Sequence, residues 1–232
     1  MTENMFASPG PLSVRTSAGI ADIIRREILA GNLKPDQPLM ERSIAQELGV
    51  SRTPVREALF TLQGEGLVEL IPRKYARVRK VTYNDISQIY ALRRVLESHS
   101  AENAAKYADN TAILAIQTAY MRQKMLDKKC TALEQTDADL AFHAAIAEAS
   151  GSQILQTVVH QVLAYTAALR SSVKYDATQT KKALAQHKAV LDAIKARNPQ
   201  KASELMSDHI VSSTLYVEKS IVKPTKGLIS PA

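Results

Sequence analysis

The sequence predicts a mainly α protein with two parts, an N-terminal winged helix-turn-helix and a C-terminal all-α antiparallel helical bundle. Two short helical patterns joined by a glycine, followed by two short apolar or alternating segments, occupy the first third of the 232 residues. After Val81 and Thr82 the chain carries long helical periodicities without strand patterns. We therefore expect a flexible arm over 1–14, a winged helix-turn-helix over 15–80, a helical domain over 81–222 and a tail over 223–232.

The composition is that of an ordinary globular protein, with 45% hydrophobic and 23% charged residues. A net charge of +7 is compatible with an anionic partner such as DNA but does not require one. The single cysteine, Cys130, excludes an internal disulfide framework and fits a reducing compartment. Since neither a signal peptide nor a membrane-spanning run is evident, we expect a cytoplasmic protein without a membrane partner.

The N-terminal part begins with two predicted helices. Isoleucines repeat at helical spacing over Ala18–Leu29, which gives this segment one apolar face. The prolines of Lys34–Pro38 predict a turn or an extended connector. The second helix, Glu41–Leu48, should end at Gly49, because glycine adopts the left-handed backbone angles that terminate a helix.

A third helix follows this glycine and is the predicted DNA-recognition helix. Ser51 or Thr53 can cap it, and Pro54 lies in its first turn, where a missing N–H is harmless. Arg52 and Arg56 are four residues apart, so both project from one face near the start of the helix. In a helix-turn-helix this end of the second helix meets base edges in the major groove, and the arginine fork matches guanine.

A basic hairpin is expected after the recognition helix. Leu67–Ile71 is a short apolar run, Pro72–Lys74 is a turn, and Tyr75–Arg79 alternates as a strand does. Five positive charges crowd this segment: Arg73, Lys74, Arg77, Arg79 and Lys80. Such a wing lies along phosphates or enters the minor groove, and Lys74 and Arg77 are its candidate phosphate contacts. The plain alternative is a solvated loop; the adjoining helix-turn-helix favours DNA.

The C-terminal part is predicted to be helical throughout. Helix caps support the boundaries, since Gly151 follows one helix and Pro199 occupies the first position of the last. The expected helices are Asn84–Tyr107, Thr111–Lys128, Ala132–Glu148, Ser152–Val173, Thr178–Ala196 and Pro199–Val222.

Four residues of these helices form a candidate metal site. Asp139 and His143 are four apart and share a helix face, while His187 and His209 lie on two later helices. Facing helices of a bundle can bring such side chains together, and one carboxylate with three imidazoles suits Zn, Ni, Fe or Mn. Taken singly, a helical histidine is more often a hydrogen-bonded core residue. The residues alone leave both interpretations open.

The N-terminal motif resembles a known family. Ser51–Leu59, within Leu39–Val78 and together with Glu65–Val68, resembles the DNA-binding domain of GntR-family bacterial transcription regulators. The resemblance implies a partner, double-stranded operator DNA. The family usually carries glycine at the wing turn, where this chain has Tyr75. The DNA-contacting positions of the family fall on Arg42, Arg52 and Arg56, with Ser51 and Thr53 beside them.

The helical part resembles the FCD effector domain of the FadR branch of that family. The matching motifs are Asp139–His143, Gln186-His187 and Met206–His209. Arg93–Glu97 resembles the first helix of that domain, which implies that Arg93 faces an effector pocket. Ser152 stands where asparagine is common. The resemblance further implies a divalent metal bound by Asp139, His143, His187 and His209.

The leading interpretation is a metabolite-responsive regulator that binds operator DNA as a homodimer and is not an enzyme. Its effector would be a small carboxylate, held at a non-catalytic Zn, Ni, Mn or Fe ion. One alternative is a metal-dependent hydrolase with an accessory domain, because a metal with open positions activates water. No further carboxylate stands in an obvious general-base relation to the four ligands. The third class of function is a structural or interaction bundle, which would give Arg52 and Arg56 no role.

Overall fold

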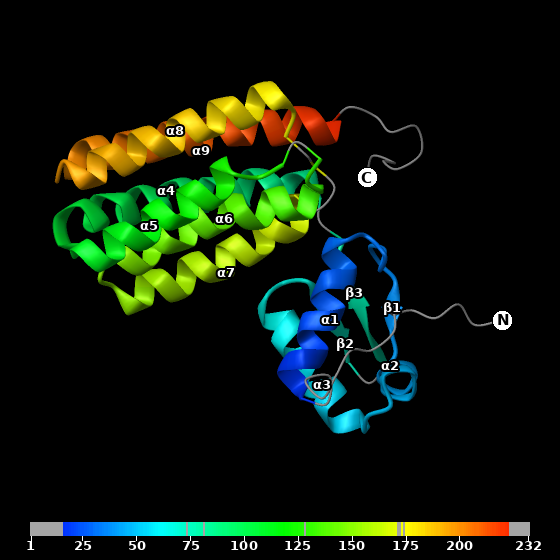
Figure 1. The fold of residues 1–232 in the computed structure, drawn as a ribbon. Coiled ribbons are helices and arrows are strands. Elements are labelled where there is room, and N and C mark those ends of the chain that lie inside the picture. Colours follow the sequence, from blue (N-terminus) through cyan, green and yellow to red (C-terminus); the bar gives the residue numbers. More distant parts are fainter. Residues whose placement is uncertain are drawn as a thin grey trace. The chain divides into compact units, whose positions relative to one another are not determined.

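The computed structural model of the protein describes residues 16–72, 74–80, 82–127, 129–170, 173 and 175–222. The expected arm 1–14, the tail 223–232 and the wing residue Arg73 lie outside the described residues. The predicted fold class is confirmed, since the described part is mostly helical with one small sheet (Figure 1). The chain divides into two compact units, Met1–Val81 and Thr82–Ala232.

The N-terminal unit combines three helices with a three-stranded sheet. Ile20 and Ile24 of the first helix are fully buried, as are Val55 and Leu62 of the third, and these two helices pack together into the core. The apolar faces predicted from helical spacing are therefore the faces that the unit buries. Its elements in chain order are α1 (Ser17–Leu29), β1 (Pro38–Leu39), α2 (Glu41–Leu48), α3 (Arg52–Gly64), β2 (Val68–Ile71) and β3 (Tyr75–Val78).

The sheet is antiparallel, with strand order β1-β3-β2. The hairpin of β2 and β3 is the predicted wing, and its register places Glu69 opposite Arg77. The prediction of a connector over Lys34–Pro38 was incomplete, because Pro38–Leu39 forms the edge strand β1. Leu39 is completely buried, which draws this segment onto the sheet, and proline is tolerated at a sheet edge.

The C-terminal unit is a bundle of helices in which α4 packs against α6, α7, α8 and α9 (Figure 1). Capping boxes begin two helices, with Thr82 and Asp85 at one and Thr131 and Glu134 at the other. The helices are α4 (Tyr83–Tyr107), α5 (Asn110–Lys124), α6 (Ala132–Ala149), α7 (Gln153–Arg170), α8 (Ala177–Lys195) and α9 (Pro199–Val222).

Most predicted helix boundaries in this unit differ from the structure by at most one residue. The largest difference is at α5, which ends at Lys124 and not at Lys128. The Asp127 carboxylate accepts a hydrogen bond from the backbone N–H of Lys129, which favours a turn there. None of the described helices combines the length and apolarity that crossing a bilayer requires.

The core of the bundle contains a group of ionisable side chains among its apolar residues. Buried charges are rare in protein cores unless they are paired or bind a ligand. Each of these side chains is at most 2% exposed: Arg93, Glu97, Asp139, His143, Arg170, His187 and His209.

Candidate functional site

A groove of about 550 Å³ on the N-terminal unit brings together four of the seven predicted DNA-binding residues. It lies between the start of α2, one face of α3 and the wing. Phe60, 56% exposed, and Tyr75 add aromatic surface to it. The predicted residues that line it are Arg42, Arg52, Arg56 and Lys74.

Glu41, the first residue of α2, holds both recognition-helix arginines. Arg56 donates from Nε and Nη2 to its two carboxylate oxygens at 2.8 and 2.9 Å, and Arg52 donates at 3.1 Å. The hydrogen bond from Arg56, together with that from Arg52, holds the pKa of the Glu41 carboxyl below its ordinary value. Sequence reasoning missed Glu41, because it precedes α3 on another helix and no spacing rule links the two.

The start of α3 agrees with the predicted helix-turn-helix geometry. Gly49 ends α2 with φ 65°, in the left-handed region that favours glycine. Ser51 occupies the N-cap of α3, although its side chain makes no capping hydrogen bond. Ser51 and Thr53 are both exposed, so their hydroxyl groups lie at the surface beside the arginines.

Arg77, the remaining predicted DNA contact, does not line the groove. It alternates with the buried Ala76 and Val78 along β3. Its Nη2 lies 2.7 Å from Glu69 on the neighbouring strand, and its Nη1 lies 3.4 Å from Asp36. Its charge is therefore already paired within the unit.

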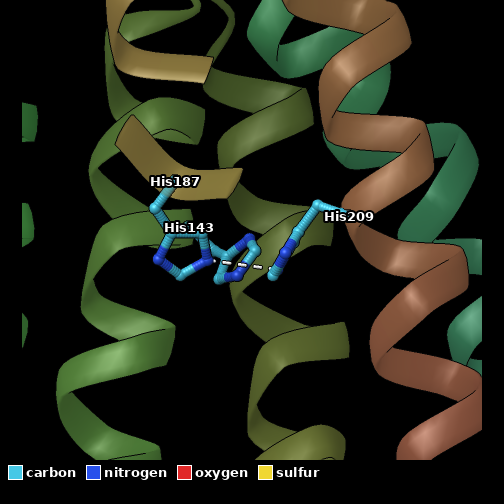
Figure 2. Close-up of side chains that lie close together, drawn as sticks. All are labelled: His143, His187 and His209. Atoms are coloured by element: carbon cyan, nitrogen blue, oxygen red, sulfur yellow. Dashed lines mark hydrogen bonds between the residues drawn. The ribbon is translucent and has the colours of Figure 1, made fainter. Parts of the chain in front are cut away.

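In the bundle, the three predicted histidine ligands meet. His143 of α6, His187 of α8 and His209 of α9 each offer a ring nitrogen, and these nitrogens lie within 4.8 Å of one another (Figure 2). All three side chains are buried. Among the described residues they form a group that can hold a metal ion.

The hydrogen bonds around the rings assign the proton positions of His187. Gln123 donates from Nε2 to Asp139 Oδ1 at 2.8 Å, so its oxygen faces His187 Nδ1 at 2.7 Å. That nitrogen must therefore carry the proton, which leaves a lone pair on Nε2. His209 Nδ1 likewise faces the oxygen of Gln186, at 3.1 Å.

The Nε2 atoms of His187 and His209 also face each other. They lie 3.1 Å apart, within hydrogen-bonding distance (dashed line in Figure 2), and which of the two donates depends on which ring nitrogens carry the protons. Burial lowers the pKa of His187 to about 3 and that of His209 well below its ordinary value, so both rings are neutral near pH 7. Neutral imidazoles that converge in this way are the form that binds a metal ion.

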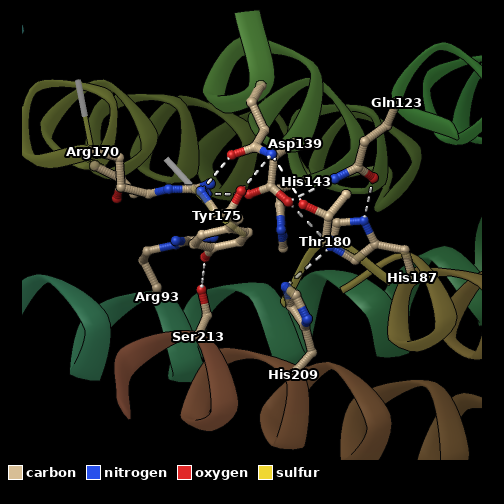
Figure 3. A network of polar contacts seen from close by, with 12 residues as sticks. Arg93, Gln123, Asp139, His143, Arg170, Tyr175, Thr180, His187, His209 and Ser213 are labelled. Atoms are coloured by element: carbon tan, nitrogen blue, oxygen red, sulfur yellow. Dashed lines mark hydrogen bonds and ion pairs between the residues drawn. The ribbon is translucent and has the colours of Figure 1, made fainter. Parts of the chain in front are cut away.

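Asp139, the fourth predicted ligand, lies beside the histidines within a larger polar network (Figure 3). Its Oδ1 is 3.8 Å from His187 Nε2, and its Oδ2 contacts Arg170. Burial alone would raise the pKa of this carboxyl, but the charge of Arg170 and the nearby histidines hold it well below the ordinary value. Asp139 is therefore ionised and keeps one oxygen on the histidine side.

Arg93, the predicted effector-binding residue, lies buried in the same network (Figure 3). Its Nε donates to Glu97 Oε1 at 2.6 Å, and the other oxygen of Glu97 contacts His143. Burial alone would raise the pKa of Glu97, yet Arg93 and His143 lower it to about 2. The spacing of four residues could have revealed the Arg93–Glu97 pair. Nothing in the sequence pointed to Arg170, which lies 31 residues after Asp139 on another helix.

Sequence relatives and a solved structure resemble this chain over most of its length. The chain is 30% identical to the Glc operon transcriptional activator of Escherichia coli, over 82% of this chain and 84% of that protein. It is 26% identical to a probable D-xylose utilization operon transcriptional repressor of Paenarthrobacter nicotinovorans, over 83% and 84%. The solved structure of E. coli McbR/YncC matches with a TM-score of 0.71 at 19% identity, over 91% of this chain and all of that one, which shows a shared fold.

Two family models account for most of the chain. The model of bacterial regulatory proteins of the gntR family matches residues 16–78, which include the groove. The FCD domain model matches residues 88–212, which include the histidines. The chain therefore belongs to the gntR family of bacterial regulatory proteins, carries an FCD domain, and is a transcriptional regulator of that type.

Proposed function

We propose that this regulator binds operator DNA sequence-specifically as a homodimer and that its FCD domain binds a divalent metal and a small carboxylate effector. The observation that carries the effector half is the convergence of His143, His187 and His209, with two Nε2 atoms 3.1 Å apart. The basic groove of the N-terminal unit supports the DNA half. Because its target is the bacterial chromosome, we place the protein in the cytoplasm.

In this proposal α3 enters the major groove. Arg52 and Arg56 read base edges, and Glu41 keeps their guanidinium groups together before DNA arrives. Arg42 and Lys74 line the same groove and contact phosphates. The exposed hydroxyls of Ser51 and Thr53 add DNA contacts near the start of α3. Arg77 makes a weaker phosphate contact, because acidic neighbours already pair with its charge. Two copies of one short helix, related by a two-fold axis, read two half-sites.

The proposed metal is supported by the donor set around the three rings. Three imidazoles and the Asp139 carboxylate suit Zn, Ni, Mn or Fe. Gln123 and Gln186 accept hydrogen bonds from the outer ring nitrogens, an arrangement that orients metal-binding histidines. The Nε2 atom of His143 has no hydrogen-bond partner among the described residues. The residues present therefore fit a divalent ion, whose role we propose to be effector binding and not catalysis.

The effector half links this site to DNA binding. Four protein ligands leave positions open on a six-coordinate ion, and a small carboxylate is suited to them. Arg93 holds the far side of the anion, since its Nη1 has no partner among the described residues. If the effector prefers one arrangement of the DNA-binding units, occupancy of the operator shifts, typically by about 5- to 150-fold.

The test is operator binding under defined metal and ligand conditions. Fluorescence anisotropy compares a DNA fragment from upstream of the protein's own gene with a scrambled fragment of equal length. The protein is first stripped of metal and then loaded with Zn, Ni, Mn or Fe. We expect preference for the upstream fragment, and a response to small carboxylates in the metal-loaded protein alone. Light scattering should show a dimer.

Each half of the proposal has its own contrary result. Equal affinity for the two fragments would reject sequence-specific binding near this gene. A preference that no combination of metal and carboxylate alters would reject the effector site. A monomer at micromolar concentration, with one chain bound per DNA site, would reject the homodimer.

A further inference from the structure

A second buried arginine near the histidines, Arg170, has no hydrogen-bond partner for its Nε and Nη2 atoms among the described residues. Arg170 ends α7 and is completely buried. Its Nη1 contacts Asp139, and its guanidinium lies 4.2 Å from the centre of the Tyr175 ring, so its plane is fixed. Its Nε and Nη2 atoms find no hydrogen-bond partner within the described part of the chain. Two unmet N–H groups on a buried cation are costly, which indicates that they serve a ligand.

Other arginines of this protein show what the Nε–Nη2 edge binds. Arg25 and Arg56 each hold a glutamate carboxylate with it, at N···O distances of 2.5 to 2.9 Å. Two parallel N–H groups match the two oxygens of a carboxylate. Arg93 already uses this edge on Glu97. Of the two arginines buried in the network, it is Arg170 that offers an open two-point site for a carboxylate.

The charge balance of the network indicates how many anionic groups a ligand needs. The negative charges of Glu97 and Asp139 balance the positive charges of Arg93 and Arg170, and all four side chains are at most 2% exposed. A divalent ion on neutral imidazoles adds two positive charges inside the bundle. A monocarboxylate removes one of them and a dicarboxylate removes both. Because uncompensated buried charge is strongly unfavourable, the balance favours a ligand of charge −2.

Further polar atoms without partners lie around the two arginines. The Tyr90 hydroxyl, on α4, has no partner among the described residues, nor does Arg93 Nη1. The ring centre of Tyr90 lies 5.0 Å from the guanidinium of Arg93. Figure 3 shows Arg93 and Arg170 extending toward Tyr175, with His187 and His209 on the other side of the network. The network therefore has a cationic end and an imidazole end.

We infer that the effector is a dicarboxylate whose second carboxylate is bound by the Nε and Nη2 atoms of Arg170. The first carboxylate occupies the histidine end, as in the proposed function, on which this inference rests. Arg93 Nη1 and the Tyr90 hydroxyl donate further hydrogen bonds to the second carboxylate. Arg170 thereby sets the specificity of the site for two negative charges over one.

The experiment is isothermal titration calorimetry on the metal-loaded, full-length protein. The probes are malonate, succinate and glutarate, each beside its own monomethyl ester, which keeps the length and removes one charge. At least one diacid should bind about 10- to 100-fold tighter than its ester, as expected for a charge-assisted two-point contact. Elemental analysis checks the metal content of every sample.

Arg170→Lys sharpens the test, because lysine keeps a positive charge beside Asp139 but has no two-point edge. The variant should lose the preference for the diacid over its monoester, and elemental analysis shows whether it still takes up metal. Arg122→Lys, at an exposed position of α5, is the matched control and should keep that preference.

The outcomes separate this inference from the proposed function. Equal binding of every diacid and its ester by the wild type would overturn the dicarboxylate and leave the carboxylate site standing. Metal uptake without binding of any of the six compounds would overturn the carboxylate effector and the inference together. A diacid preference that survives in Arg170→Lys would overturn the role of Arg170. The wild-type comparison holds whether or not the variant folds.

Discussion

The proposed site in each unit of this regulator includes two arginines that pair with carboxylates, one pair of arginines at the surface and the other buried. Arg52 and Arg56 share one carboxylate on the surface, and their side chains are 63% and 56% exposed. Arg93 and Arg170 each have a carboxylate of their own and are 1% and 0% exposed. The chemistry of the pairs is the same, and the difference lies in the water around them.

This difference indicates what each pair can do. Water and salt screen an exposed pair, so a DNA base or phosphate can replace Glu41 without a large penalty. A buried pair cannot be opened in this way, because the arginine would be left uncompensated in a medium of low polarity. In the proposed function, the surface arginines can therefore exchange Glu41 for DNA, and the buried ones form a fixed frame around the proposed effector site.

The largest effect should come from breaking a buried pair. Glu97→Gln leaves Arg93 uncompensated and should lower the free energy of unfolding by about 3–5 kcal/mol. Urea unfolding at pH 7 measures this change. The matched control is Glu102→Gln on the same helix, which breaks partly exposed pairs with Lys106 and His99 and should change stability little. Similar losses in the two variants would contradict the comparison.

Metal removal should have the next largest effect. Binding to the folded state stabilises it by about 2.7 kcal/mol when free metal is 100 times its dissociation constant. Chelator should therefore lower the melting temperature of the wild type, and His187→Ala and His209→Ala should take up less metal. The exposed His160→Ala is the control. If the purified wild type contains no metal and chelator does not change its melting temperature, the three histidines are ordinary core residues.

Removal of the surface arginines should weaken DNA binding and leave the fold intact. Arg52→Ala or Arg56→Ala should reduce operator affinity roughly 5- to 150-fold, the loss expected for one two-point base contact. Anisotropy titrations measure the affinity, and circular dichroism checks the fold. Arg26→Ala, exposed on α1 and away from the groove, should bind as the wild type does. A folded Arg52→Ala/Arg56→Ala double variant with normal affinity would rule out α3 as the recognition helix.

Substitution of two wing residues, Lys74 and Arg77, should change the salt dependence of DNA binding to different extents, because of these two only the charge of Arg77 is paired with acidic neighbours among the described residues of the unit. Lys74→Ala should weaken binding to all sequences and reduce the salt slope of the binding constant by about 0.9, one phosphate contact. Arg77→Ala should reduce that slope less, because Glu69 and Asp36 already neutralise the arginine. Titrations at several salt concentrations give both slopes. A larger change for Arg77→Ala would reverse this ranking.

The smallest expected effect is the contribution of the surface carboxylate of Glu41 to stability and its dependence on pH. The pKa of Glu41 is lowered by the hydrogen bonds from Arg56 and Arg52, so its contribution to stability exists above the ordinary glutamate pKa. That contribution is lost as the pH falls through the lowered value, and by the general range for surface pairs it is below about 1 kcal/mol. NMR titration of the Glu41 carboxyl should show a lowered pKa in the wild type and a higher one in Arg56→Ala, where Arg52 remains as its partner. Identical titrations would mean that the pair does not persist in solution.

The sequence by itself determined the local features of both units. The sequence predicts the helix-turn-helix from two features: Gly49 between two segments with apolar residues at helical spacing, and the four-residue spacing of Arg52 and Arg56. Both features act within one or two helical turns. Asp139 and His143 share a face for the same reason. The edge strand Pro38–Leu39 was missed, since its two residues form a strand only against β3.

Tertiary structure alone decided the partners of the charged groups. Glu41 meets Arg56 across the helix-turn, and Arg170 meets Asp139 across 31 residues and two helices. The 3.1 Å approach of the His187 and His209 nitrogens likewise depends on how α8 packs against α9. Periodicity predicts which face of a helix is buried. It does not predict which helix covers that face, or which residues of the two helices lie at the same level along the bundle. Contacts between distant helices are set by the packing of the whole core, and that packing leaves the Nε and Nη2 atoms of Arg170 without a partner among the described residues.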